Sequence, residues 1–399
     1  VTSSLEPKGL NEYNEIKIES EDNDSYKYFK WNFSNQGNTI AISEIKLDFY
    51  DKVRKIVKFT SSTIEPTGKI RSTSNSVIYN NSDASLNIKE GNVILTKNGN
   101  YNAITNLGTL TLGTLTKINS SSTAIYNDTN SQATVNSKSI IADQYDIYNN
   151  TDRKLTVNIQ SATSKGYFVY NSGGSELDIT AKSISSENGI YNSGLENSNI
   201  NVDTSTNTND FLYNVGSGNM TVNVKTASGN IQNNGKSNIE IGVINQAERI
   251  SNNDVGQINI TATNATISDG IHNSGNGNIT GTIDKIESQK IGVENSGTGT
   301  IEATINTLNI VKDSKLTDSD AYSIKNSGSG TINLSVSSII FDAKKIFGRN
   351  YVIYNESVGN IYVHGNKIIF QNAPVSSNYV NKKFSSFIYN NSTGLIEVN

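Results

Sequence analysis

The segment Gly189-Ile190-Tyr191-Asn192-Ser193-Gly194 contains a motif that recurs along most of this chain of 399 residues. The motif is an aliphatic residue, one variable residue and then asparagine. Fourteen copies occur, and their asparagines are Asn80, Asn106, Asn127, Asn149, Asn171, Asn192, Asn214, Asn233, Asn252, Asn273, Asn295, Asn326, Asn355 and Asn390. From Asn106 to Asn295, successive motif asparagines lie 19 to 22 residues apart. A fixed period of this length indicates a repeat protein whose units stack on one another.

About six residues after each motif asparagine, aliphatic residues begin to alternate with polar ones. Leu155, Val157 and Ile159 follow Asn149 in this way. A period of two is typical of strands whose alternate side chains enter one core. The residues between the asparagine and this strand are mostly Gly, Ser, Asn and Thr, which build tight corners. The sequence therefore predicts an all-β fold: a right-handed, single-stranded parallel β-helix of about fourteen coils, each of roughly 19–22 residues.

The two ends of the chain depart from this regular repeat. Residues 1–70 lack the motif and hold many of the large aromatic side chains, so we expect an N-terminal β-rich cap there, with one or two irregular coils, and a parallel β-solenoid over residues 71–399. After Asn295 the intervals lengthen to 31, 29 and 35 residues. The extra residues, near 311–322, 341–351 and 371–386, share one place in the coil and should project from one edge. The chain stops within a coil, which indicates that it is a piece of a longer protein.

Composition excludes several kinds of partner and site. The net charge of −4 and the isoelectric point near 5.4 argue against nucleic acid, or an anionic membrane, bound by bulk charge. The absence of cysteine excludes disulfides and thiolate metal sites. No apolar run is long enough to span a membrane, so we expect no direct membrane insertion by this segment.

The ionisable residues do not form an obvious reaction centre. Asp146, Asp210 and Asp269 lie three or four residues before their motif asparagine, but other coils have no acid there. His272 and His364 occupy different places in their coils, and we expect both to face solvent. The tandem calcium-binding repeat of β-roll toxins is also missing. We therefore predict that the protein is not an enzyme and has no catalytic residue, metal site or cofactor.

The motif asparagines suggest a structural role. If their side chains lie above one another, each amide can donate to the next and satisfy the backbone of the corner. We predict such a ladder, rather than a ligand site, from Asn127, Asn149, Asn171, Asn192, Asn214, Asn233, Asn252, Asn273 and Asn295.

Two sets of residues are candidates for ligand binding. The variable residue of the motif should face outward, and in five successive coils it is tyrosine: Tyr126, Tyr148, Tyr170, Tyr191 and Tyr213. These tyrosines would either bind a partner or only pack across strands. The second set is the insertion edge, which carries Lys344, Lys345, Lys382 and Lys383. We favour the insertion edge, because loops outside the ladder cost ordering entropy without adding to it.

Gly189–Gly194 and the stretch Asn295-Ser296-Gly297-Thr298-Gly299-Thr300-Ile301 resemble the coils of type V autotransporter passenger domains of Gram-negative bacteria. The resemblance covers about residues 71–399 and is one of style, since the translocator barrel of that family is missing here. It implies a right-handed β-helix at the bacterial cell surface, most often an adhesin and sometimes a vacuolating cytotoxin. The expected function is an extracellular adhesive rod that binds a host-cell or matrix protein, a glycan or other copies of itself. The alternatives are a self-assembling surface fibre or S-layer-like subunit, and a β-helix enzyme that degrades polysaccharides.

Overall fold

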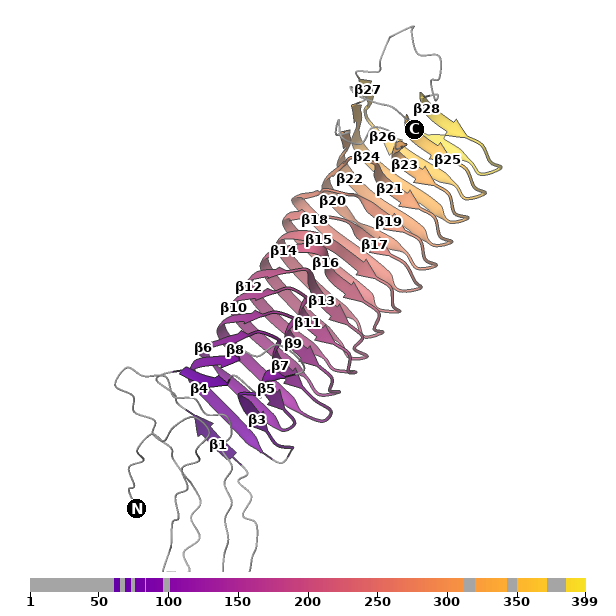
Figure 1. Ribbon diagram of the computed structural model, residues 1–399. Coiled ribbons are helices and arrows are strands. Elements are labelled where there is room, and N and C mark those ends of the chain that lie inside the picture. The colour runs from indigo at the N-terminus through magenta and orange to yellow at the C-terminus, as the bar shows by residue number, and fades with distance from the viewer. Residues whose placement is uncertain are drawn as a thin grey trace, which may run out of the picture. The chain divides into compact units, whose positions relative to one another are not determined.

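The structure is a computed structural model, and it describes residues 61–64, 69–72, 76–82, 84–95, 101–311, 320–342, 350–371 and 385–399. All of them belong to one compact unit, residues 33–399. The described residues form strands, turns and bends and contain no helix. Successive coils lie one above the next, and all strand pairs within the stack are parallel (Figure 1). The prediction of an all-β parallel β-solenoid is confirmed.

Each coil contains one short strand that ends at the motif asparagine, and these are called the motif strands. Most of them are separate strands: β3 (Ile78–Asn80), β5 (Asn102–Asn106), β7 (Thr123–Asn127), β9 (Tyr145–Asn149), β11 (Tyr167–Asn171), β13 (Asn188–Asn192), β17 (Ile250–Asn252), β19 (Ile271–Asn273), β21 (Ile291–Asn295), β23 (Ala321–Asn326), β25 (Asn350–Asn355) and β28 (Ser385–Asn390). Each pairs in register with its copy in the next coil, so asparagine lies beside asparagine. The sequence period therefore sets the register.

A long strand follows each corner and supplies the other walls of the coil. The long strands are β4 (Ser85–Leu95), β6 (Thr109–Ser120), β8 (Gln132–Ala142), β10 (Leu155–Ser164), β12 (Leu177–Ser186), β16 (Asn238–Ala247), β18 (Gln257–Ile267), β20 (Ile279–Ser288), β22 (Thr300–Val311) and β24 (Thr331–Asp342). The pairing of β10 with β12 omits Gln160 and Lys182, which marks a change of direction within the long strand. Alternate side chains of these strands are buried, as the period of two predicts.

A few coils join or divide these elements. β14 (Ser198–Asn214) and β15 (Met220–Asn233) each run through a long segment and a motif segment without a break. β26 (Ile361–Gly365) and β27 (Ile368–Gln371) both pair with β24, and β29 (Ile396–Val398) pairs with β26. At the other end, β1 (Ser61–Ile64) and β2 (Lys69–Ser72) both pair with β4. Within the described residues, parallel pairing is thus present from Ser61, before the first copy of the motif.

The core is built from columns of aliphatic side chains, one residue per coil in each column. The aliphatic residue of the motif is almost completely buried in Ile125, Ile147, Val169, Ile190 and Leu212, none of which is more than 1% exposed. These five are direct neighbours across the ladder, as predicted. Each buried column removes apolar surface from water along the whole stack, which is the main stabilising contribution of the fold.

The corners after the motif asparagine are closely stacked as well. A Cβ atom added to Gly299 would lie 1.9 Å from the carbonyl oxygen of Gly277, and one added to Gly330 would lie 1.9 Å from that of Gly299. No side chain fits at these distances, so glycine alone lets the corner of one coil lie directly on the next.

Several predicted features lie outside the described residues. Apart from β1 and the first two residues of β2, the cap expected over residues 1–70 lies outside them. The same holds for most of each predicted insertion, because residues 312–319, 343–349 and 372–384 are not described.

Candidate functional site on the face of the motif strands

The outward side chains of the motif strands, including the ends of β14 and β15, make one continuous surface, which we call the motif face. Two outward positions per coil contribute to it. In β9, Tyr145 and Tyr148 face outward while Asp146 and Ile147 between them are buried. The motif face therefore has two columns of residues, one position before and four positions before the motif asparagine.

The tyrosines predicted to share a face do so. Ring centroids are 5.3 Å apart for Tyr126 and Tyr148, 5.2 Å for Tyr148 and Tyr170, 4.5 Å for Tyr170 and Tyr191, and 5.9 Å for Tyr191 and Tyr213. The rings are close to parallel, with interplanar angles between 9° and 28°. We call these five residues the tyrosine column. Because each ring covers the face of the next, the column presents ring edges and hydroxyl groups outward rather than flat aromatic faces.

Two further tyrosines widen this surface. Tyr145 and Tyr167 stack on each other with centroids 5.9 Å apart, and each meets the tyrosine column edge to face. Sequence reasoning missed them, although both lie four residues before their motif asparagine. A simple alternation of sides does not place such a residue on the outer face, because two successive inward residues follow it.

A second aromatic group, here the C-terminal tyrosine group, lies further along the motif face. It consists of Tyr322, Tyr351, Tyr354 and Tyr389, whose neighbouring centroids are 4.9 to 5.8 Å apart. Tyr322, Tyr351 and Tyr354 are buried. The hydroxyl of Tyr354 donates to Glu356 at 2.9 Å, and burial together with this carboxylate raises the pKa of Tyr354 to about 12. The Tyr354 phenol is therefore a neutral hydrogen-bond donor at neutral pH.

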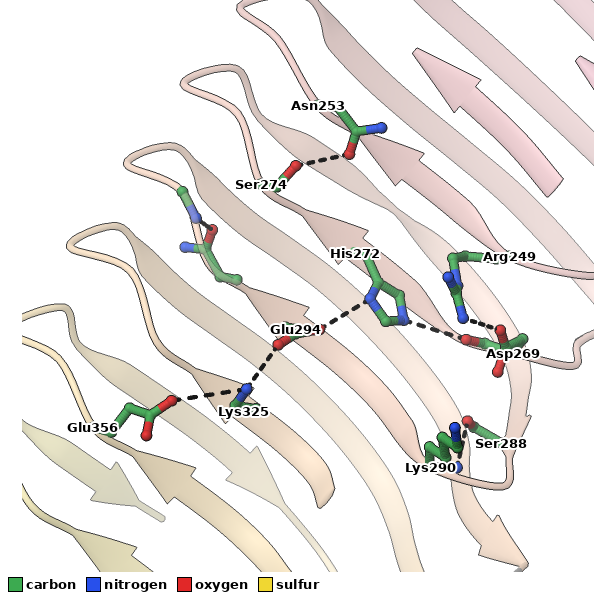
Figure 2. A network of polar contacts seen from close by, with 12 residues as sticks. Arg249, Asn253, Asp269, His272, Ser274, Ser288, Lys290, Glu294, Lys325 and Glu356 are labelled. Atoms are coloured by element: carbon green, nitrogen blue, oxygen red, sulfur yellow. Dashed lines mark hydrogen bonds and ion pairs between the residues drawn. The ribbon is translucent and has the colours of Figure 1, made fainter. Parts of the chain in front are cut away.

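Between the two aromatic groups, charged side chains link successive coils (Figure 2). Glu294 accepts from His272 Nδ1 at 3.1 Å with one oxygen and from Lys325 Nζ at 3.0 Å with the other. Lys325 Nζ is also 3.7 Å from Glu356 Oε1, and it lies over the ring of Tyr322. A separate ion pair joins Arg249 to Asp269. We call His272, Glu294, Lys325 and Glu356 the charged relay.

His272 does not face solvent as predicted, since only 17% of its side chain is exposed. Its Nε2 lies 3.3 Å from the backbone oxygen of Asp269, and its Nδ1 lies beside Glu294. Both ring nitrogens therefore lie beside oxygen atoms of other residues. The expectation was wrong because the carboxylate partner comes from the next coil, 22 residues along the chain. His364, on β26, is exposed as predicted.

The charged relay should make the free energy of unfolding depend on pH in the acidic range. Burial raises the pKa of Glu294, but the hydrogen bonds and charges of His272 and Lys325 outweigh it and lower this pKa from 4.5 to about 2. A carboxylate with a lowered pKa stabilises the fold above its unfolded pKa, and this stabilisation is lost as the pH falls towards about 2. We expect Glu294→Gln to reduce the free energy of unfolding by about 2 kcal/mol at neutral pH and to flatten its decrease in acid. Urea unfolding followed by circular dichroism from about pH 2 to about pH 7 measures both. An unchanged acid dependence in the variant would contradict the role of Glu294.

One acidic residue lies in the core instead of on the surface. Asp146 is fully buried, and neither of its carboxyl oxygens has a hydrogen-bond partner in the described structure. Asp146 lies three residues before its motif asparagine. The residues at the same position in the two neighbouring coils are Ala124 and Phe168, and both are fully buried. Burial raises the pKa of Asp146 well above its usual range, and the nearby Ser164 hydroxyl lowers it only in part. Burial therefore favours the protonated form of this carboxyl inside the core.

Asp146 is expected to make the protein less stable as the pH rises. A group whose pKa is raised on folding favours the folded state only while it stays protonated, so its contribution falls between the unfolded pKa and the folded one. We expect Asp146→Ala to increase the free energy of unfolding at neutral pH by about 1–3 kcal/mol and to remove this slope. Chemical unfolding of the wild type and the variant from about pH 4 to about pH 9 measures both effects. Asp146→Asn is the control, because its side chain is polar but does not titrate. Equal slopes in wild type and Asp146→Ala would show that Asp146 is not the titrating group.

Beneath the motif face, the motif asparagines form a hydrogen-bonded ladder. From Asn80 to Asn295, each side-chain amide donates to the side-chain oxygen of the next motif asparagine, at distances of 2.6 to 3.3 Å. The amide also reaches the corner, as where Asn252 Nδ2 donates to the backbone oxygen of Gly256 at 2.8 Å. The side-chain oxygen accepts from the corner as well, since the amide of Gly194 donates to Asn192 Oδ1 at 3.1 Å. These asparagines are buried and bonded to each other, which leaves them no contact with a ligand.

The ladder changes where the intervals lengthen. Asn295 Nδ2 donates to the oxygen of Gly299 at 2.8 Å, and Asn326 and Asn355 likewise donate to their own corners. The side-chain oxygen of Asn326 is buried without a hydrogen-bond partner in the described residues. The bond from one motif asparagine to the next is therefore interrupted after Asn295, whose amide reaches the next coil only at the backbone oxygen of Thr331, at 3.4 Å.

The other predicted binding residues are not placed. Lys344, Lys345, Lys382 and Lys383 all lie outside the described residues. No protein-family model matches the chain, and neither curated proteins nor solved structures give a match. Within the described ranges, no three His, Cys, Asp or Glu side chains gather as a metal site would require. A helix able to cross a membrane is likewise not found among these residues.

Proposed function

We propose that this chain is the exposed rod of an extracellular bacterial surface protein and that it serves in attachment, in the manner of the autotransporter passengers it resembles. The observation that supports this is the motif face itself. Each coil adds two outward residues at a spacing of about 4.8 Å, so the stack builds a long, regular surface from a short repeat. Extended surfaces of this kind are what repeat proteins use to contact large partners.

The chemistry of the motif face favours attachment over catalysis. His272, Glu294 and Lys325 are acid–base groups that lie together on it, and Glu294 is hydrogen-bonded to both of the others. A general acid or base has to reach a substrate atom directly or through one water. The charged relay is better suited to tying coils together than to proton transfer. We therefore assign it a structural role within an adhesive surface.

The insertion edge remains our preferred contact region. The tyrosine column covers its own ring faces, and its packing already explains why tyrosine is used there. The insertions contribute nothing to the repeat, and they carry the lysines that a negatively charged host surface would attract. Lys344 and Lys345 belong to one insertion, and Lys382 and Lys383 to another.

Deletion of residues 376–384 tests this assignment. We expect the deletion to weaken attachment of the purified chain to cultured epithelial cells and to immobilised collagen, fibronectin and heparin, with little change in thermal stability. The double variant Tyr170→Ser with Tyr191→Ser should keep attachment but lower the free energy of unfolding by roughly 1–3 kcal/mol, because stacked pairs are lost.

The opposite results would assign the contact region to the tyrosine column instead of the insertion edge. If the deletion leaves attachment intact and the double tyrosine variant abolishes it, the tyrosine column is the binding site. If the wild-type chain attaches to none of these surfaces, the adhesive function is contradicted. Tyr79→Ser is a suitable control, because Tyr79 is 66% exposed and lies outside the tyrosine column.

A further inference from the structure

The tyrosine column places identical, oxidisable side chains in contact along the stack. Tyr170 and Tyr191 are direct partners across the parallel ladder of β11 and β13. Their ring centroids are 4.5 Å apart and their planes differ by 9°, the closest pair of the column. Both rings are half-buried, so solvent reaches their edges while the ladder holds them in place.

We propose that the tyrosine column is a site of oxidative cross-linking, at which a peroxide-driven one-electron oxidant joins Tyr170 to Tyr191 as dityrosine. Each phenol loses one electron and one proton and becomes a phenoxyl radical. The two radicals form one carbon–carbon bond between their ring positions next to the hydroxyl. Each ring then moves the hydrogen of that carbon to its oxygen and becomes aromatic again. Overall, two hydrogens leave the protein and one hydrogen peroxide is reduced to two waters.

Geometry favours this product over competing ones. Two radicals held on neighbouring strands meet without diffusion, so their effective concentration is far above that of radicals on separate molecules. The rings are stacked with nearly parallel planes, so forming the bond requires both rings to turn about their side-chain torsions from this starting position. Tyr79 provides the contrast: it is more exposed, but it has no ring contact in the described structure.

The bond would have a direct structural consequence. It would join two successive coils covalently across the motif face, on the opposite side of the strand from the buried core column. A repeat protein opens by separation of neighbouring units, so a covalent link between two coils should slow that opening locally. This inference does not depend on the proposed attachment function.

Peroxidase with limiting hydrogen peroxide, applied to the full chain, tests the proposal. Trypsin cleaves after Lys and Arg, so Tyr170 lies on peptide 166–182 and Tyr191 on peptide 183–225. We expect mass spectrometry to find these two peptides joined, with the loss of two hydrogens, together with dityrosine fluorescence in monomeric protein. Fragmentation of the joined peptide should place the bond at Tyr170 and Tyr191.

Matched variants separate the site from general oxidation. Tyr170→Phe and Tyr191→Phe keep the stacked rings but remove the phenol, and each should abolish the joined peptide. Tyr79→Phe should leave its yield unchanged. The proposal is overturned if the peptide is absent while tyrosine oxidation occurs elsewhere, if Tyr191→Phe does not reduce it, or if the urea-unfolded chain gives the same yield.

Discussion

Replacing Ile190 by aspartate is expected to destroy the cooperative unfolding of the solenoid at neutral pH. Ile190 is 1% exposed and stands in the ladder between Val169 and Leu212, which are both fully buried. An aspartate there would carry a charge into an apolar column with no cation or donor beside it. The cost is on the order of 5 kcal/mol or more, which approaches the whole stability of many domains.

In a repeat protein, the stability lost in Ile190→Asp should affect more than one coil. Neighbouring coils stabilise each other, so damage at Ile190 should uncouple the coils on either side of it. We expect a lower urea midpoint by circular dichroism and faster proteolysis near β13. Ile190→Val removes one methyl group and should cost only about 1 kcal/mol, which makes it the matched control. If Ile190→Asp unfolds at the same midpoint as Ile190→Val, the column is not a dry core.

Replacing Asn171 by aspartate should be the next most damaging change. Asn171 Nδ2 donates to Asn192 Oδ1 at 2.8 Å, and Asn171 Oδ1 accepts from Asn149 Nδ2 at the same distance. Aspartate has nearly the same shape but no amide donor, so a carboxylate oxygen would face the oxygen of Asn192. We expect a loss of about 3 kcal/mol or more in the free energy of unfolding at neutral pH, because a buried charge is added and a donor is lost.

Acid provides a sensitive test of the asparagine ladder. A protonated aspartate has one donor again, so the deficit of Asn171→Asp should shrink as the pH is lowered. Urea midpoints of the variant and the wild type at neutral and acidic pH measure this difference. Asn158→Asp, on the exposed side of β10, is the control and should change stability little. A deficit that is independent of pH would mean that shape, rather than the donated hydrogen bond, makes asparagine necessary.

The fold was predictable because local and long-range signals agree in this chain. The spacing of the motif asparagines predicts the register, and the alternation after them predicts which side chains are buried. Pairs such as Ile147 with Val169 follow directly from both. The outward position of the tyrosine column follows from the same pattern. The lengthened intervals after Asn295 also mark, in the sequence itself, the place where the asparagine ladder is interrupted.

The candidate site was less predictable, for reasons that concern single coils. In β9 the order of outward and inward residues is Tyr145 out, Asp146 and Ile147 in, and Tyr148 out. A strict period of two places Tyr145 and Ile147 on the same side, so it hides both the second column of tyrosines and the burial of Asp146. The repeated spacing of four residues between tyrosine and asparagine was the signal available for Tyr145 and Tyr167.

By itself, the sequence determined that coils stack, where they turn and which residues of successive coils become neighbours, because a period acts on every copy alike. Only the tertiary structure decided how the neighbouring side chains meet. The tyrosine rings cover one another instead of lying flat to solvent, and His272 is tied to Glu294 of the next coil. These contacts depend on side-chain orientation between coils some 20 residues apart, and each is specific to its own pair of residues. Repetition therefore predicts the scaffold, while the chemistry of its surface is set where unlike residues of adjacent coils come into contact.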